Sequence, residues 1–191
     1  MLKKALFSIL LTLSAIFFIS CNDNSNNPND MVSSNEYVLT TLDGTQIVIK
    51  KGDKGFYIDK KKDKIVIFDI FATWCPPCQD SASHLSSLQE KYKDDLIIIA
   101  STIEKQEYDK EGKIINDKFI NFKSKYDARY IIVNSKQNKV LNTAITTMLD
   151  MGPRFPIPTI AMYKNGEYIN HYVGAVHEEF IESDIKRALG K

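Results

Sequence analysis

A buried strand that ends at a pair of cysteines constrains this chain most. Residues Ile65 to Phe71 are apolar except for Asp69, which is typical of a central strand covered on both faces. The sequence Trp-Cys-Pro-Pro-Cys follows after two residues and contains Cys75 and Cys78. The two prolines suit the first turn of a helix, where their missing amide hydrogens are not needed. Apolar residues then recur every three or four positions to about residue 93, so we expect a strand, a tight turn and an amphipathic helix.

The spacing of the two cysteines favours redox chemistry over a structural role. Two cysteines separated by two residues suit a dithiol that closes into a small disulfide ring and opens again. A disulfide across so short a loop restricts the unfolded chain little, so it would stabilise the fold little. The chain has three cysteines, and the third is Cys21. If Cys21 carries lipid, the pair must exchange electrons with another molecule.

Strand and helix patterns alternate over the rest of the chain. Asp43-Gly44 and Asn165-Gly166 each lie between two β-rich runs and are hairpin signals. The pattern predicts strands at 37–42, 46–50, 56–58, 65–71, 96–100, 130–133, 159–163 and 168–173. It predicts helices at about 76–93, 115–126, 140–148 and 178–189, with Gly152 and Pro153 closing the third.

The first 20 residues resemble an export signal. Lys3 and Lys4 precede a 16-residue uncharged stretch from Ala5 to Ser20, which is short for a bilayer span of roughly 20 residues. Phe18-Ile19-Ser20-Cys21 resembles the bacterial lipobox, in which the cysteine becomes the lipidated first residue of the mature protein. We therefore expect a signal peptide at 1–20 and lipidation of Cys21. An uncleaved anchor, or an ordinary signal with an incidental cysteine, is the alternative.

Residues 21–36 are expected to be a flexible tether. They are rich in Asn, Asp and Ser and contain too few apolar residues to offset the entropy of ordering. One domain would then occupy 37–191. The formal net charge of +1 offers no electrostatic footprint for nucleic acid. These features predict an extracytoplasmic domain held at the periplasmic side of a membrane by lipid on Cys21.

The chain resembles the thioredoxin superfamily. The residues that carry the resemblance are Phe68-Asp69-Ile70-Phe71-Ala72-Thr73-Trp74-Cys75-Pro76-Pro77-Cys78, and Ile157-Pro158-Thr159 ahead of the last hairpin and helix. The membrane-anchored TlpA and ResA type is the nearest subgroup. The resemblance implies an α/β thioredoxin fold: a central mixed sheet flanked by helices, an N-terminal β-hairpin and an insertion before the cis-proline.

The resemblance also implies roles for the residues around the dithiol. Cys75 would be the nucleophile, because a helix N-terminus favours its thiolate, and Cys78 would resolve the mixed disulfide. Asp69 matches the buried carboxylate that thioredoxins use to move a proton to and from the resolving cysteine, and burial raises the pKa of such a group. The alternative for Asp69 is a strand-end carboxylate bonded to backbone amides. The prolines remove two amide donors from the thiolate, which favours a reductase over a strong oxidant.

The docking surface can be predicted in the same way. Pro158, rather than Pro156, is the expected cis-proline, and the backbone of Ile157 would pair with a substrate chain. Trp74 would cover the site and contact partners; otherwise it is a partly buried aromatic. The ResA type usually carries Glu and Pro where this chain has Ser81 and Ser83, which transfers any proton handling to Asp69.

Two classes of function remain open at this point. The first is a thiol-disulfide oxidoreductase that reduces disulfides of exported proteins with electrons from a membrane donor protein, with an oxidase or isomerase as a variant of it. The second is a non-catalytic, thioredoxin-fold binding lipoprotein. We expect no cofactor other than the Cys75–Cys78 disulfide. Covalent haem would need His where Gln79 stands, and zinc would need two more ligands than the pair provides.

Overall fold

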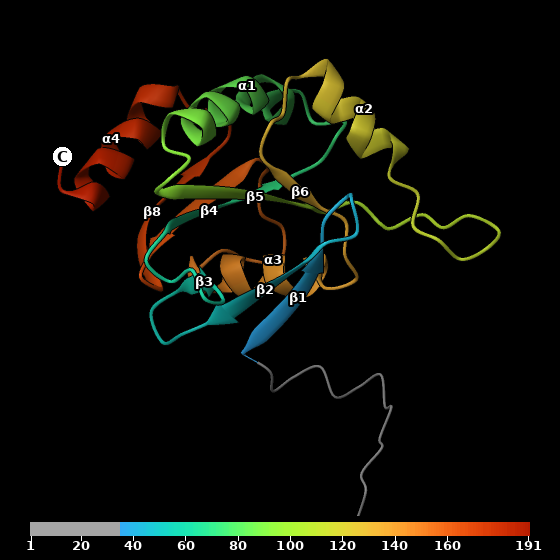
Figure 1. Ribbon diagram of the computed structural model, residues 1–191, viewed down its shortest axis with the longest axis horizontal. Helices are drawn as coiled ribbons and strands as arrows, with labels where there is room; N and C mark the ends of the chain where they lie inside the picture. The colour runs from blue at the N-terminus through green and yellow to red at the C-terminus, as the bar shows by residue number, and fades with distance from the viewer. Residues whose placement is uncertain (1–34) are drawn as a thin grey trace, which may run out of the picture. The chain divides into compact units, whose positions relative to one another are not determined.

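The computed structural model describes residues 35–191. The expected signal segment, Cys21 and nearly all of the expected tether lie outside these residues. The described part contains eight strands and four helices, with the strands arranged in two sheets (Figure 1). Within it, no helix combines the length and the apolar character needed to cross a bilayer.

The larger sheet is mixed and has the order β6-β5-β4-β7-β8. β4 is the predicted central strand, and all seven of its residues are buried. It pairs in parallel with β5 and antiparallel with β7, which places a parallel and an antiparallel neighbour on its two sides. The strands are β4 (Ile65–Phe71), β5 (Leu96–Thr102), β6 (Ile131–Val133), β7 (Thr159–Lys164) and β8 (Glu167–Val173).

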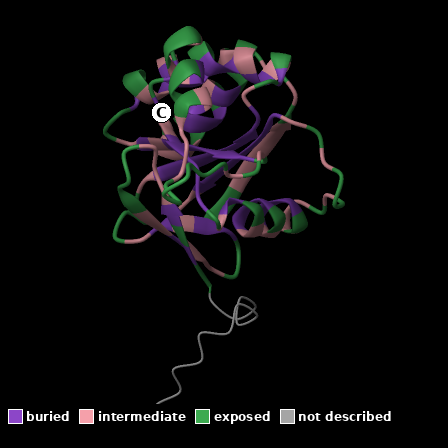
Figure 2. Ribbon diagram, turned by 90° about the vertical axis from the view of Figure 1, so that its right-hand side faces the viewer, coloured by how far each residue is buried: buried purple, intermediate pink, exposed green. Residues whose placement is uncertain are grey.

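Helices cover both faces of this sheet (Figure 1). Alternate residues of β4 belong to two separate apolar cores, one shared with the helices α1, α2 and α4 and the other with α3. This is the arrangement expected for a strand that is apolar at every position but one. Figure 2 shows the buried strands lying between outer layers with exposed surfaces. The helices are α1 (Pro76–Lys91), α2 (Asp117–Lys125), α3 (Asn138–Met148) and α4 (Glu178–Leu189).

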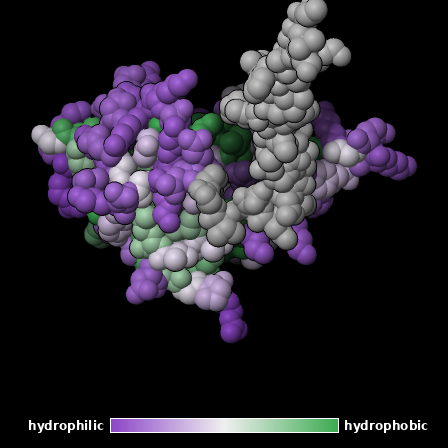
Figure 3. Space-filling view, turned by 90° about the horizontal axis from the view of Figure 1, so that it is seen from below, coloured by the Kyte–Doolittle hydropathy of each residue, from purple (hydrophilic) through white to green (hydrophobic). Residues whose placement is uncertain are grey.

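The smaller sheet extends the predicted N-terminal hairpin by one strand. β1 (Glu36–Thr40), β2 (Gln46–Lys51) and β3 (Phe56–Ile58) form an antiparallel sheet that packs on the α3 side of the domain. Phe56 of β3 joins it to the larger sheet, with ring centroids 6.1 Å from Phe68 and 5.4 Å from Tyr163. Figure 3 views the domain from below and shows less polar side chains near the middle of this face, with hydrophilic ones around them.

The β7–β8 hairpin forms where the sequence predicts it, whereas two predicted helix boundaries differ from the structure. Asn165 and Gly166 have φ of 57° and 78°, the left-handed pair that a two-residue hairpin turn needs, so the β7–β8 hairpin is confirmed. The prediction that Ile115 belongs to α2 was wrong, because its N–H donates to the carbonyl of Glu107 in the preceding loop. α3 ends before the predicted Gly152, and the left-handed residue after it is Asp150, with φ of 56°.

Candidate active site

Cys75 lies where β4 turns into α1. It is the N-cap of α1 in an extended conformation, and Pro76 and Pro77 are the first two helical residues. This fits the prolines, because the first amides of a helix have no partner within the helix. Cys78 follows inside the first turn. The predicted strand, turn and helix are therefore confirmed around the motif.

The two cysteines form a disulfide with an S–S distance of 2.23 Å. Both residues are buried. The backbone N–H of Cys78 donates to Sγ of Cys75 at 3.3 Å, so one amide of the helix N-terminus points at this sulfur. Because the prolines supply no N–H, Cys78 is the one residue of the first three in α1 that can make this contact. An amide donor and the helix dipole both favour a thiolate at Cys75 in the reduced protein.

The Ile157–Pro158 peptide bond is cis, which confirms Pro158 rather than Pro156 as the cis-proline. It lies directly against the disulfide: Sγ of Cys75 is 3.7 Å from the carbonyl oxygen of Ile157. The carbonyl of Pro158 accepts from the N–H of Gly174, which ties this segment to the end of β8. The fold thus brings together two motifs that are 82 positions apart in the chain.

Asp69 lies in β4 and is 1% exposed. It is opposite Ala100 of β5, and its alternation along β4 with Ile67 and Phe71 places it on the same side of the sheet as both cysteines. Its Oδ1 has no hydrogen-bond partner among the described residues, which does not fit the alternative of a carboxylate bonded to backbone amides. Burial raises the pKa of Asp69 to about 7.

Tyr130 is a second buried polar residue on this side of the sheet. Its hydroxyl also has no partner within the described part, and it belongs to the same core as the cysteines. Burial raises the pKa of Tyr130, and the negative charge of Asp69 raises it further. Sequence reasoning identified Tyr130 only as a strand residue, because nothing in a single tyrosine indicates a neighbouring carboxylate.

Comparisons with known proteins agree with this geometry. The thioredoxin family model matches residues 48–120, which include β4, the two cysteines and α1. The thiol-disulfide oxidoreductase ResA of Bacillus thuringiensis is 25% identical over 152 residues, covering 79% of this chain and 73% of ResA. The chain therefore carries a thioredoxin domain and is similar to the ResA type of this superfamily. These findings indicate a thiol-disulfide oxidoreductase of the ResA type, and the structure pairs Cys75 with Cys78 in a disulfide.

Solved structures of this superfamily share the fold. A thioredoxin-family thiol:disulfide interchange protein from Chlorobium tepidum matches with a TM-score of 0.60 and 20% identity, covering 82% of this chain and 95% of that one. The exposed lipoprotein thioredoxin Etrx1 of Streptococcus pneumoniae matches with a TM-score of 0.52 and 20% identity, covering 80% and 98%. The predicted thioredoxin fold is therefore confirmed.

The chain departs from the ResA pattern on α1. Ser81 occupies the position of the usual Glu, is buried, and donates its hydroxyl hydrogen to the carbonyl of Pro77 at 2.9 Å. The buried residues of α1 include no carboxylate. Of the residues in β4 and α1, Asp69 is therefore the one buried carboxylate, and it lies on the side of the sheet that holds the cysteines.

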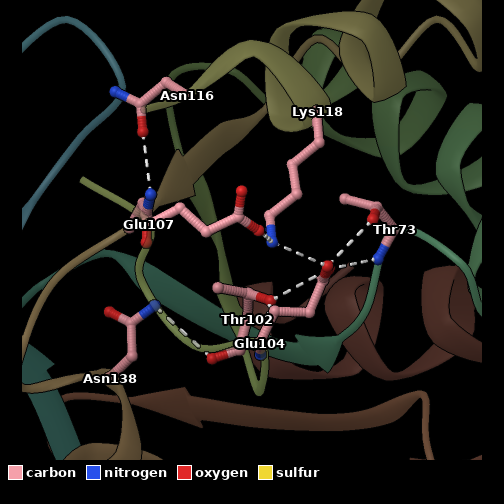
Figure 4. A network of polar contacts seen from close by, with 8 residues as sticks. Thr73, Thr102, Glu104, Glu107, Asn116, Lys118 and Asn138 are labelled. Carbon is pink, nitrogen blue, oxygen red and sulfur yellow. Dashed lines mark hydrogen bonds and ion pairs between the residues drawn. The ribbon is translucent and has the colours of Figure 1, made fainter. Parts of the chain in front are cut away.

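A polar network holds the loop in front of Cys75 (Figure 4). The carboxylate of Glu104 accepts from the backbone N–H of Thr73 at 2.7 Å and from its hydroxyl at 3.2 Å. Lys118 of α2 forms an ion pair with Glu104 at 3.2 Å, and the Glu104 side chain is only 10% exposed. The carbonyl of Thr73 accepts from the Gln79 side chain at 2.8 Å. Thr73 is thus held at both its N–H and its carbonyl.

Trp74 follows the residue that this network holds. Trp74 follows Thr73 directly and is 63% exposed, so most of its side chain is available to a partner rather than packed in the core. Sequence reasoning singled out Trp74 but missed Glu104, which lies 31 positions from Thr73. No local pattern in the sequence indicates that contact.

Proposed function

We propose that this thiol-disulfide oxidoreductase is a protein-disulfide reductase that works outside the cytoplasm. The observation that carries the proposal is Asp69, a buried carboxylate with a pKa of about 7 on the side of the sheet that holds the dithiol. A group of that pKa is a general base and a general acid near neutrality. No cofactor other than the protein's own dithiol is required.

The reaction begins with the reduced protein. The Cys75 thiolate attacks one sulfur of a substrate disulfide, and the other substrate sulfur leaves as a thiolate that takes up a proton. Cys78 then transfers its proton to Asp69 and attacks Sγ of Cys75, which releases the second substrate sulfur as a thiolate; this thiolate takes up the proton that Asp69 gives back. Two electrons have passed from the dithiol to the substrate; one proton of the two product thiols comes from Cys78 and the other from solvent. The Cys75–Cys78 disulfide seen in the structure is the oxidised product state of the protein.

Substrate docking uses the backbone beside the dithiol. The carbonyl of Ile157, 3.7 Å from Sγ of Cys75, accepts a hydrogen bond from an extended substrate chain, as a strand edge does. The exposed ring of Trp74, the residue before Cys75, packs on the same chain. Docking of this kind recognises backbone, so it allows many exported proteins as substrates.

The cellular setting follows from the N-terminal sequence. The signal-like segment and Cys21 support export and lipidation, which would hold the domain at a membrane. Etrx1 of Streptococcus pneumoniae, a structural neighbour, is described as an exposed lipoprotein. A membrane protein with a dithiol of its own would return Cys75 and Cys78 to the reduced state. Lipidation is tested by incorporation of labelled fatty acid, which Cys21→Ser should abolish.

Insulin reduction tests the enzymatic proposal. The wild-type chain should accelerate precipitation of the insulin B chain in the presence of dithiothreitol, and Cys75→Ser should reduce the rate to the uncatalysed background. Cys78→Ser should retain the first step and accumulate a mixed disulfide between Cys75 and the substrate, visible on a non-reducing gel. Equal rates for the wild type and Cys75→Ser would refute catalysis and favour a binding lipoprotein.

A further inference from the structure

A recess opens on the α3 side of the sheet, near the segments that hold the redox site. It has a volume of about 480 Å³ and lies between the segment that follows β5, the first half of α3, and the residues that precede the cis-proline. The segment after β5 extends away from the sheet before it enters α2 (Figure 1). We call this recess the lysine groove, after Lys105, Lys136 and Lys139 in its lining.

The residues that line the lysine groove are linked to the redox site at two points. Glu104 lines the groove and holds Thr73, which is two residues before Cys75 (Figure 4). Phe155 lines it as well and is two residues before Ile157, whose carbonyl contacts the Cys75 sulfur. Because two residues of extended chain span about 7 Å at most, Thr73 lies within about 7 Å of Cys75, and Phe155 lies within about 7 Å of Ile157.

The groove combines apolar contact area with positive charge. Ile103 and Tyr108 are 42% and 44% exposed, which is high for large apolar side chains. The three lysines of the groove are exposed and take part in no ion pair among the described residues. This set of charges is not balanced from within the groove, because its one carboxylate, Glu104, is already paired with Lys118.

The acidic side chains near the groove already have other ion-pair or hydrogen-bond partners. Glu107 forms an ion pair with Lys118 at 2.7 Å, and Asp109 accepts hydrogen bonds from the N–H groups of Glu111 and Lys113 in its own turn. The lysines therefore face solvent beside the exposed apolar side chains of Ile103 and Tyr108, above buried polar residues that include Asn138 and Asn142. A ligand with negative charge and apolar bulk complements such a surface.

We infer that the lysine groove binds an acidic stretch of the substrate polypeptide, about two to four residues from the cysteine that reacts with Cys75. The inference rests on the proposed function and narrows its substrate class. A polypeptide is the occupant because the groove adjoins the docking edge at Ile157, where a substrate chain leaves the dithiol in extended form. The backbone contacts at Ile157 give general binding, and the groove adds a preference for acidic flanking sequence.

The test uses two disulfide-bonded peptides that differ only at the residues two to four positions from one cysteine. One peptide carries aspartates there and the other carries lysines. The purified full-length chain should reduce the acidic peptide with a kcat/KM about tenfold higher than that for the basic peptide. Lys136→Glu/Lys139→Glu should abolish or reverse this ratio. Because the ratio is taken within one protein sample, any unfolded fraction cancels.

A charge-matched control distinguishes the groove from net charge. Lys110→Glu/Lys113→Glu changes two exposed lysines of the neighbouring loop that do not line the groove, and it should keep the wild-type ratio. Equal kcat/KM for the two peptides with wild-type protein, or equal loss in both double variants, would overturn the inference while leaving the reductase intact. Failure to reduce either peptide would instead refute the proposed function.

An anionic membrane surface is the competing occupant, and a vesicle experiment decides between the two. Sedimentation with vesicles of phosphatidylcholine, with and without phosphatidylserine, measures binding to lipid charge. If Lys136→Glu/Lys139→Glu weakens only vesicle binding and keeps the peptide ratio, the groove is a lipid contact and the inference is wrong. Loss of the peptide ratio with unchanged vesicle binding supports it.

Discussion

Replacing Asp69 with asparagine should stabilise the oxidised protein at alkaline pH and change its stability little near pH 4. In the oxidised state Cys75 and Cys78 do not titrate, so Asp69 is the group of the site that changes charge. Asparagine and a protonated aspartate are both neutral and similar in shape. The difference between the variant and the wild type at high pH therefore isolates the free-energy cost of burying the carboxylate charge.

The magnitude follows from the two pKa values of Asp69. Burial raises the pKa from 3.8 to about 7 in the folded protein. Between these values the folded state binds the proton more tightly than the unfolded state, so the wild-type free energy of unfolding falls as the pH rises from about 4 to about 7, and is level above that. A shift of about 3 units at about 1.4 kcal/mol per unit makes the cost about 4 kcal/mol. Asp69→Asn removes this cost.

Urea unfolding of the oxidised proteins, followed by far-UV circular dichroism, measures the effect. With an m-value of about 2 kcal/mol per molar urea, Asp69→Asn should raise the midpoint by about 2 M near pH 8 and by little near pH 4. Asp53→Asn, at an exposed position, is the matched control and should shift neither midpoint. A difference between Asp69→Asn and the wild type that is the same at both pH values would refute the assignment of a buried charge to Asp69. The stabilised variant should also lose reductase activity, because Cys78 loses its proton acceptor.

Two further substitutions test the packing around the site. Glu104→Ala removes the acceptor of the Thr73 N–H and should lower the free energy of unfolding by about 1–3 kcal/mol. It should also shift the fluorescence of Trp74, the only tryptophan. A loss of stability with unchanged fluorescence would contradict a role of Glu104 in holding this loop. Gly55→Ala places a methyl group 2.5 Å from the Tyr163 ring and should cost about 1–3 kcal/mol, measured as a lower urea midpoint. Gly152→Ala, with nothing within 4 Å of the added carbon, should change the midpoint little, and equal effects at the two glycines would contradict the steric argument.

Features that depend on local sequence could be predicted well. The apolar run from Ile65 to Phe71 becomes the central strand because a strand with apolar residues on both faces must be covered on both sides. The prolines after Cys75 open the helix, and Asn165-Gly166 makes the hairpin turn, because each residue type favours one backbone conformation. The cis-proline could be placed from its position ahead of the last hairpin.

Features that depend on side chains meeting across the fold could not be predicted. The contact between Glu104 and Thr73 joins residues from two loops, and no periodicity indicates it. The neighbourhood of Tyr130 and Asp69 depends on how β6 packs against the rest of the sheet. The predicted and observed helix boundaries also differ where a loop offers competing hydrogen bonds. Ile115 is an example, because its N–H donates to the carbonyl of Glu107 and the residue lies outside α2. The catalytic roles of Cys75, Cys78 and Asp69 and the lipidation of Cys21 stay predictions.

The reduction potential of the Cys75–Cys78 pair tests the central claim most directly. It is measured by equilibrating the full-length chain with glutathione or dithiothreitol redox buffers at pH 7 and quantifying the oxidised fraction of the protein by thiol labelling. With one amide donor at the Cys75 sulfur and two prolines in the ring, we expect a value near that of thioredoxin, about −270 mV, as a reductant requires. A value near about −120 mV, typical of a strong oxidant, would contradict the account and assign the chain to disulfide formation.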